Sequence, residues 1–313
     1  MGLLPLFGQL RAIIYRVVFI NNKNRLSGEA PLLEVFNRKE RQAHQAALTA
    51  GFLFFFSCAA LCGEEWMPWT EKDLELYPQC CYLYQNYKDV ATSSGTQHRH
   101  GDDHFFAGAL STSFAAWSAE IEAIVAETRR QHACLDSVRI TGRYQWLSDT
   151  VGDPVALMTG ITIIKATTSA LHDISSFHQG KFAGEMFVSI GKERPCWDDW
   201  LSRWWGGVGI GLGDHGAPWI RGRLAWEKNF HKTLHARLFL NALLGLGSRS
   251  LSVNDFDGYG TIQHRSVDVG FRISKRTDFC GIYRLGYARR IYAYNFPKAA
   301  NLFLLSFVYP MGL

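Results

Sequence analysis

The sequence has little proline, little charge and, beyond residue 62, no long apolar run. With 47% hydrophobic and only 19% charged residues in 313 positions, the chain does not have the low hydrophobicity that keeps a chain disordered. After residue 62 no segment reaches the roughly eighteen apolar residues that a membrane-spanning helix needs. Any membrane passage beyond that point must therefore use β-strands.

Aromatic residues, in contrast, are abundant, with ten Trp, twelve Tyr and twenty-one Phe. A chain whose strands alternate apolar and polar residues averages to a nearly neutral hydropathy, as amphipathic barrels do. The formal net charge of +5 is weakly basic, and the basic residues are spread along the chain. Because they form no single patch, we expect no nucleic acid among the partners.

The N-terminal part divides into an extension and an export signal. Residues 1–38 are expected to form an N-terminal extension, which a start placed too far upstream would explain. Within 39–62, Lys39 and Arg41 precede the apolar run 46–61, which ends in small residues. This basic, apolar, small-residue order is that of a secretory signal peptide, and an uncleaved N-terminal helix is the alternative. Cleavage near residue 62 would leave a periplasmic segment, 63–78, followed by the main domain, 79–313.

That main domain alternates at period two. From Leu234 to Leu244, every second residue is Leu or Ala, and the opposite face begins His235, Arg237. This spacing is that of a strand, since a helix repeats every 3.6 residues. Turn residues divide the domain into strands at about 80–90, 104–114, 119–130, 136–147, 155–167, 180–192, 203–212, 218–228, 233–246, 262–274, 279–293 and 300–311.

These segments predict an all-β fold, a transmembrane antiparallel up-and-down β-barrel of about 12 strands, with 10 as the fallback. Their lengths suit tilted membrane strands, and bacterial single-chain barrels have even strand numbers. The connections alternate between short turns and mostly longer loops such as 91–103, 168–179 and 247–261, an asymmetry typical of outer-membrane barrels. The last strand, with Phe303, Leu305 and Phe307 on one face, would close the barrel.

Several stretches together resemble the outer-membrane barrel proteins of chlamydia-like bacteria. The matching stretches are Thr141-Gly-Arg-Tyr144, Val151-Gly-Asp-Pro-Val155, Leu171-His-Asp-Ile-Ser-Ser-Phe-His178, Ser202-Arg-Trp-Trp-Gly206, Gly213-Asp-His-Gly-Ala-Pro-Trp219, Gly258-Tyr-Gly260 and Asn301-Leu-Phe-Leu-Leu-Ser306. The resemblance covers about 65–313 and implies an integral protein of the bacterial outer membrane. It implies no catalytic residue.

The inward faces of the predicted strands carry more arginine than carboxylate, which favours anions in a water-filled pore. The predicted lumen residues are Arg139, Arg143, Arg221, Arg223, Arg237, Arg272, Arg284 and Arg290, with Glu120, Glu122, Glu185, Glu227 and Asp268. Charges that line a dry interior would instead have to pair. We therefore expect a passive pore or permeability protein, and a structural or surface-interaction barrel is the alternative. Arg289 falls on the lipid side, which requires a bulge or snorkelling nearby.

Polar residues gather in the predicted extracellular loops, and an outer-membrane lipid hydrolase is therefore a second alternative. The rim candidates are His172, Asp173, Ser176, His178, Asp214, His215, Asp257 and His264. None of them follows a specific catalytic or metal-ligand spacing, so we expect no metal site and no cofactor. The glycines of 206–213 lie within a strand with no helix after it, which favours a kink or a close packing point over nucleotide binding.

The remaining partner predictions concern the envelope. Outer-membrane lipid and small anionic solutes are the expected partners of a lipid-embedded pore. Five cysteines follow the signal peptide, an odd number for an exported chain. Cys196 and Cys280 lie near the predicted periplasmic rim, where disulfides to other envelope proteins could form.

Overall fold

The computed structural model describes residues 66–313 except 197–198, 231, 278–280 and 313. The predicted extension and signal peptide therefore lie outside the described residues, as does Cys280. The long strands are β1 (Glu75–Thr92), β2 (Gly95–Phe114), β3 (Trp117–Glu127), β4 (Cys134–Leu147), β5 (Ala156–Ala166), β6 (Phe182–Cys196), β7 (Asp199–Gly213), β8 (Trp219–Phe230), β9 (Leu234–Gly245), β10 (Arg265–Thr277), β11 (Gly281–Tyr294) and β13 (Asn301–Val308). The short elements are α3 (Thr168–Leu171), β12 (Phe296–Lys298) and β14 (Met311–Gly312). Within the described part, no helix is long and apolar enough to cross a membrane.

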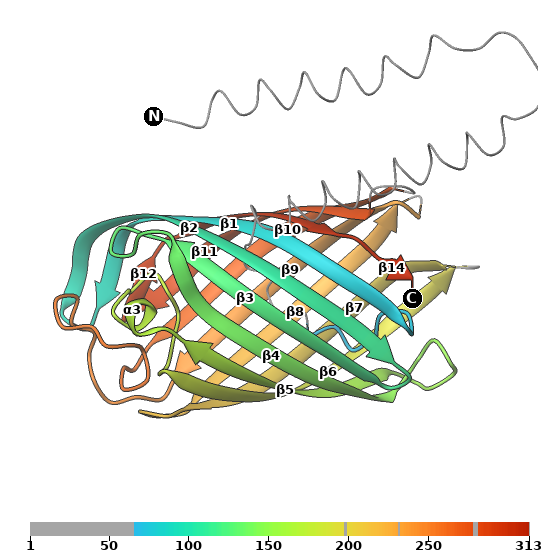
Figure 1. Cartoon of the computed structure of the whole chain (residues 1–313), viewed down its shortest axis with the longest axis horizontal. Helices are drawn as coiled ribbons and strands as arrows, with labels where there is room; N and C mark the ends of the chain where they lie inside the picture. The colour runs from blue at the N-terminus through green and yellow to red at the C-terminus, as the bar shows by residue number, and fades with distance from the viewer. Residues whose placement is uncertain (1–65, 197–198, 231, 278–280, 313) are drawn as a thin grey trace, which may run out of the picture. The chain divides into compact units, whose positions relative to one another are not determined.

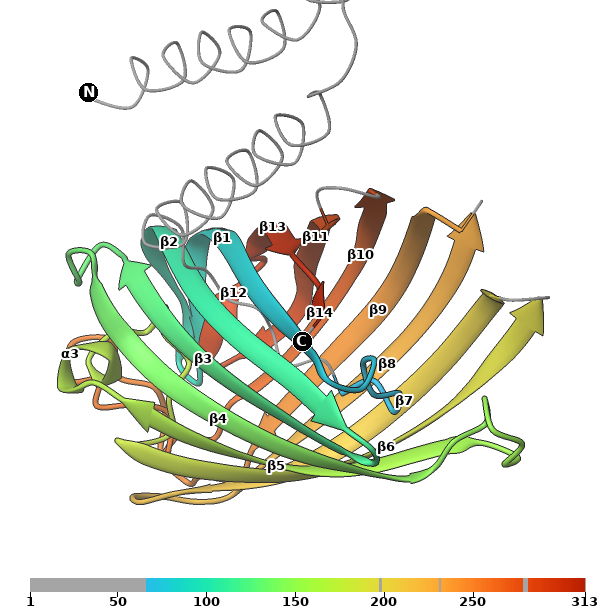
Figure 2. The same ribbon diagram turned by 45° about the vertical axis from the view of Figure 1, so that its right-hand side comes forward.

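Each long strand pairs antiparallel with its neighbours, and the sheet closes on itself (Figures 1 and 2). β1 pairs with β2 on one side and with β13 on the other, where Gln79 faces Val308 and Asn86 faces Asn301. β12 and β14 continue the pairing along the two ends of β1. Closure leaves no long strand with an unpaired edge. The prediction of an all-β antiparallel barrel of twelve strands is confirmed.

Side chains alternate between the inside and the outside of the barrel. In β3 every second residue from Ser118 to Ala126 is buried, whereas Ile121 is 49% exposed on the outside. The exposed residues of the other strands are likewise mostly aliphatic or aromatic, for example Ile140, Leu238 and Leu305. The barrel is therefore apolar outside and polar inside, the reverse of a soluble barrel with an apolar core.

Two groups of aromatic side chains lie at different levels of the outer face. Near one end the ring of Tyr144 lies 4.7 Å from that of Trp117 and 4.7 Å from that of Trp146. Near the other end Phe303 lies 6.1 Å from Tyr84 and 5.0 Å from Tyr287. Aromatic residues at two levels match the girdles by which membrane barrels meet the two interfaces.

The connections differ between the two ends of the barrel. At one end, here called the turn end, most connections are short, such as 115–116 and 231–233. The opposite, loop end carries 128–133, 167–181 with α3, 214–218, 246–264 and 295–300. The predicted loop 91–103 is wrong, because β1 and β2 continue as a ribbon to a turn at 93–94. Gly95 makes that turn with φ +133°, and the Thr92 hydroxyl donates to its carbonyl at 2.7 Å.

A bulge interrupts the pairing of β10 and β11. Val267 faces Tyr292, but the next residue, Asp268, faces Arg290, so Ile291 is the extra residue. Arg289 and Arg290 lie before the bulge in regular alternation, so Arg290 is buried inside and Arg289 is exposed outside. The sequence predicted a bulge or snorkelling near Arg289; a bulge lies two residues beyond it, and Arg289 stays on the outside.

Gly211 of β7 gives a test of how tightly the interior is packed. A Cβ at this position would lie 2.0 Å from the ring of Trp219, which is 1% exposed. We expect Gly211→Ala to lower the free energy of unfolding by about 1–3 kcal/mol, because the ring must move. Urea unfolding of the protein in lipid vesicles measures the difference.

The matched control is Gly184→Ala in the neighbouring strand, where a Cβ would meet no atom within 4 Å. That change should stay within about 0.5 kcal/mol of the parent chain. Equal stability of the two variants would contradict the described packing at Trp219.

Candidate functional site

The interior of the barrel contains a network of arginines and carboxylates. Its densest part surrounds Glu227 of β8, which is 2% exposed. Arg203 of β7 lies 2.7 Å from one carboxylate oxygen, and Arg237 of β9 contacts the other. Register places the three residues side by side, since Glu227 faces both Arg203 and Arg237 in the sheet. One carboxylate thus bridges two cations across three strands.

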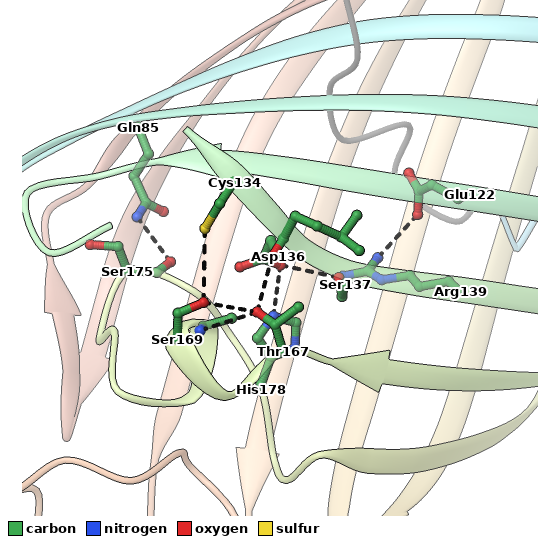
Figure 3. Close-up of polar contacts among 12 residues, drawn as sticks. Gln85, Glu122, Cys134, Asp136, Ser137, Arg139, Thr167, Ser169, Ser175 and His178 are labelled. Carbon is green, nitrogen blue, oxygen red and sulfur yellow. Dashed lines mark hydrogen bonds and ion pairs between the residues drawn. The ribbon is translucent and has the colours of Figure 1, made fainter. Parts of the chain in front are cut away.

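The other predicted inward carboxylates also lie beside arginines. Arg143 is 2.9 Å from Glu120, Arg139 is 3.5 Å from Glu122, Arg221 is 3.3 Å from Glu185, and Arg290 holds Asp268 through two hydrogen bonds of 2.7 and 3.1 Å. Figure 3 shows the Arg139–Glu122 pair on β4 and β3. Arg223 lies over the ring of Trp66, 4.7 Å from its centroid. Arg272 and Arg284 occupy β10 and β11, opposite Arg237 and Ser306 respectively.

Arg203 is missing from the predicted set. It begins the predicted strand 203–212, and it precedes Trp205 and Gly207 at period two. That alternation was the available signal for an inward side chain. The adjacent tryptophans, Trp204 and Trp205, obscured it, because either face could have been the apolar one.

Residues 66–73, here called the lumen segment, lie inside the barrel ahead of β1. Figure 2 shows this segment in blue, within the outline of the barrel. Trp66 is fully buried and stacks on Phe187 of β6 at 4.8 Å. Met67 presents its sulfur to Arg203 at 3.6 Å and to Arg237 at 3.2 Å. These contacts fix one side of the segment on β6, β7 and β9.

The other side of the lumen segment contacts the opposite part of the wall. The Trp69 indole donates to Asp149 at 2.7 Å, and the Thr70 hydroxyl donates to Gln145 of β4 at 3.1 Å. Glu71 accepts a hydrogen bond from Ser111 of β2 at 2.8 Å. Burial raises the pKa of Glu71, although Ser111 and Arg143 oppose that shift. The segment therefore crosses the lumen from β9 to β2, whereas the sequence predicted a periplasmic stretch at 63–78.

Two glycines of β7 make room for the lumen segment. A Cβ at Gly207 would lie 3.0 Å from the Trp66 ring, and one at Gly209 would lie 2.6 Å from it. The close packing point predicted for the glycine run is therefore confirmed. A cavity of about 40 Å³ remains beside the segment, bordered by Glu71, Glu120 and Arg284. That volume suffices for little more than a single water molecule.

At the loop end, an apolar group here called the cap cluster packs between loops and strands. Its buried members are Tyr87, Val90, Ile174, Leu251, Val253, Phe256, Tyr259, Ile262, Phe296 and Ala300. Tyr259 is central, with its ring 4.9 Å from those of Phe256 and Phe296 and its hydroxyl donating to the carbonyl of Ile174 at 2.7 Å. Burial raises the pKa of Tyr259 well above its usual value.

Loop 246–264 contacts elements all around the loop end. Arg99 of β2 donates to the carbonyl of Val253 at 3.4 Å, and Arg130 of the β3–β4 loop donates to the same oxygen at 3.2 Å. Across the barrel, the Ala217 amide donates to the carbonyl of Gly260 at 2.7 Å. A loop held at β2, at the β3–β4 loop and at the β7–β8 loop extends across the end of the barrel.

The predicted rim residues do not converge on one site. His178 and Asp136 form a buried 2.7 Å pair, shown in Figure 3. His264 is fully buried among aromatic rings, and burial lowers its pKa to about 4, so it is neutral at pH 7. The remaining candidates lie in separate pairs: His172 is 3.7 Å from Asp257, Asp214 is 3.4 Å from His215, and Asp173 accepts from Thr128.

Ser176 is buried two residues from His178 but does not serve as its partner. Among the described residues its hydroxyl makes no hydrogen bond to that imidazole. The imidazole is instead bound to Asp136, whose carboxylate also accepts a hydrogen bond from the Ser137 hydroxyl at 3.1 Å. Within the described chain, no group of three or more His, Cys, Asp or Glu residues could hold a metal ion.

No known protein family and no curated protein matches this sequence. Solved structures do match in fold. An outer-membrane channel from Pseudomonas putida F1 has a TM-score of 0.57 at 8% identity, covering 79% of this chain and 100% of that chain. The NanC porin has a TM-score of 0.50 at 6% identity, covering 75% of this chain and 99% of that chain. The likeness concerns the barrel fold, and the resemblance to proteins of chlamydia-like bacteria stays a prediction.

Glu227→Gln tests the interior network. The change leaves the largely buried guanidinium groups of Arg203 and Arg237 beside a neutral amide. We expect the free energy of unfolding to fall by about 3 kcal/mol, because an uncompensated buried charge is costly. The matched control is Asp257→Asn, since Asp257 is 77% exposed near His172 and should contribute less than about 1 kcal/mol. Similar unfolding midpoints for both variants in urea would contradict the network.

Proposed function

We propose that the protein is an integral protein of the bacterial outer membrane and acts as a passive pore for small anionic solutes, closed in this conformation by the lumen segment. The outer face supports a membrane location, because it exposes aliphatic side chains between two levels of aromatic rings. In water such a surface would drive aggregation. In a bilayer it is the expected lipid-facing surface.

The two ends support an orientation. Membrane barrels keep short turns on the periplasmic side and longer loops outside. The turn end, where the lumen segment enters, would therefore face the periplasm, and the cap cluster would face the exterior. Cys196 belongs to the turn end, and its predicted disulfide to an envelope partner stays a prediction, as does that of Cys280.

The observation that carries the proposal is how the lumen segment is held. Residues 66–72 bind the wall mainly through side chains, such as Trp66 on Phe187 and Glu71 on Ser111, and the nearest ladder-type contact is the isolated bridge of Asp73 to Ser113. The wall strands, in contrast, are joined along their whole lengths by backbone pairing. The segment can therefore leave the lumen while the barrel stays intact.

The proposed preference for anions rests on the balance of inward charge. The eight predicted arginines and Arg203 make nine cations. The five predicted carboxylates, Glu71 and Glu193, which faces Arg203 across β6 and β7, make seven anions. An interior with two more positive than negative groups attracts anions and repels cations. The bias is modest, since salt screens exposed charges within about 10 Å at 0.1 M.

A structural barrel without transport is the second candidate function. The cap cluster favours it, because apolar packing among loops at the exterior end closes a path that a constitutive pore would leave open. The paired inward charges favour it as well. The lipid hydrolase receives no support from geometry, since Ser176 is buried and makes no hydrogen bond to His178 among the described residues.

Conductance discriminates between the two candidates. Refolded protein in a planar bilayer should show a small conductance, and Trp66→Ala with Trp69→Ala should raise it severalfold, because the two indoles anchor the lumen segment. Trp226→Ala is the matched control, since that side chain is 46% exposed on the outside and should change nothing. If correctly inserted parent and variant both fail to conduct, the structural candidate replaces the pore.

The charge selectivity of the pore tests the role of the inward arginines. Replacing Arg221 and Arg223 by Gln removes two inward positive charges of one strand while leaving the outer face unchanged. We expect insertion to survive and the anion preference to fall, as a shift of the reversal potential under a salt gradient. A parent protein that prefers cations, or a double variant with an unchanged reversal potential, would contradict the assignment.

A further inference from the structure

The outer face of β8 to β11 has a groove near the loop end. Gly222 of β8 and Ala242 of β9 face each other there, and a Cβ at Gly222 would lie 4.0 Å from that of Ala242. The next outward row toward the loop end is Ile220 and Leu244, and the next row toward the turn end is Leu224 and Leu240. Small side chains between two rows of large ones leave a groove on this part of the outer face.

The groove has a volume of about 350 Å³ and continues onto β10 and β11. Its far wall consists of Val267 and Tyr292, which face each other in the sheet. Arg265 lies at the end of this wall, with its guanidinium 5.9 Å from the ring of Tyr294. Apart from that cation and Ser266, the lining is apolar or aromatic. It suits a hydrocarbon chain rather than a polar solute.

Two outward arginines flank the groove. Arg265 faces Tyr294 and Arg289 faces Val269, so their Cα atoms lie four residues and one strand apart, roughly 14 Å. The midpoint is the Val267–Tyr292 pair, which belongs to the groove. Both extended side chains can therefore reach one group above it. Among the described residues, neither arginine has a carboxylate within ion-pair distance.

An arginine on the lipid-facing side is costly unless it lies near the interface or meets an anion. Arg289 and Arg290 precede the bulge at Ile291, and regular alternation with Arg290 inside leaves Arg289 outside. Arg289 also lies opposite Asn301, which accepts a hydrogen bond from Tyr287 at 2.9 Å. Arg289 and Asn301 thus lie between the outer aromatic side chains around Phe303 and the polar end of the β1–β2 ribbon. Lipid phosphates would lie at this level.

We propose that this groove binds one acyl chain of an anionic phospholipid, whose phosphate, not neutralised by a cation in its own headgroup, lies between Arg265 and Arg289. Guanidinium groups bind phosphate oxygens through charge-assisted, often bidentate hydrogen bonds. The glycine and alanine floor receives the chain. The inference rests on the membrane location proposed above, but it does not depend on whether the lumen conducts.

Native mass spectrometry of the refolded full chain in detergent tests this site, with dipalmitoyl phosphatidylglycerol and dipalmitoyl phosphatidylcholine as matched probes. The parent protein should retain one phosphatidylglycerol molecule at least about tenfold more strongly than phosphatidylcholine. Arg265→Gln with Arg289→Gln should remove that preference. Gly222→Leu, which fills the groove, should weaken retention of both lipids. Heat-modifiable mobility on gels verifies that every variant is folded.

Lys165→Gln with Lys181→Gln is the control, because both lysines are exposed near the loop end around β5 and β6, far around the barrel from β10. It should retain phosphatidylglycerol as the parent does. Equal retention of the two lipids by the parent, or undiminished preference in the double arginine variant, would overturn the proposal. Measuring the conductance of the same samples distinguishes the lipid site from the proposed pore. A protein that does not conduct but keeps its preference for phosphatidylglycerol contradicts the pore and leaves the lipid site standing.

Discussion

Closure of the sheet is the constraint on which the rest of the structure depends. In a hydrocarbon environment every backbone amide and carbonyl must find a partner within the protein, and only a closed sheet satisfies all its strands. Pairing of β1 with β13 provides that closure here. Once the sheet is closed, the alternation of side chains assigns apolar residues to the outside, and the charged residues of the same strands must lie inside.

The inward charges then determine what the interior can contain. Each predicted inward carboxylate lies against at least one arginine, and Glu227 lies against two, because an isolated charge would cost several kcal/mol. The lumen segment contacts the arginines of this network mainly through uncharged aromatic rings and a thioether. Indole rings lie over Arg203 and Arg223, and the Met67 sulfur faces Arg203 and Arg237. The same wall that would attract anions thus holds the segment in place.

Strand positions and the inside-outside assignment were predictable because period two is a local signal. The inward placement of Arg221 and Arg237 follows from it directly. The path of the lumen segment was not predictable, since residues 66–73 lack periodicity and their partners lie up to 170 positions away, as for Met67 and Arg237. The β1–β2 ribbon was missed for a different reason: its polar residues, including His98 and Asp102, resemble a loop, but cross-strand hydrogen bonds satisfy them.

The central claim is that a removable segment closes a passive pore. Swelling of liposomes tests it most directly, with the barrel lacking residues 66–72 compared with the parent in isotonic solutions of a small organic anion, a small organic cation and a neutral sugar. The account predicts faster swelling of the truncated protein, with the anion entering faster than the cation. Folded, inserted protein that gives no swelling with any of the three solutes, with or without the segment, would contradict it.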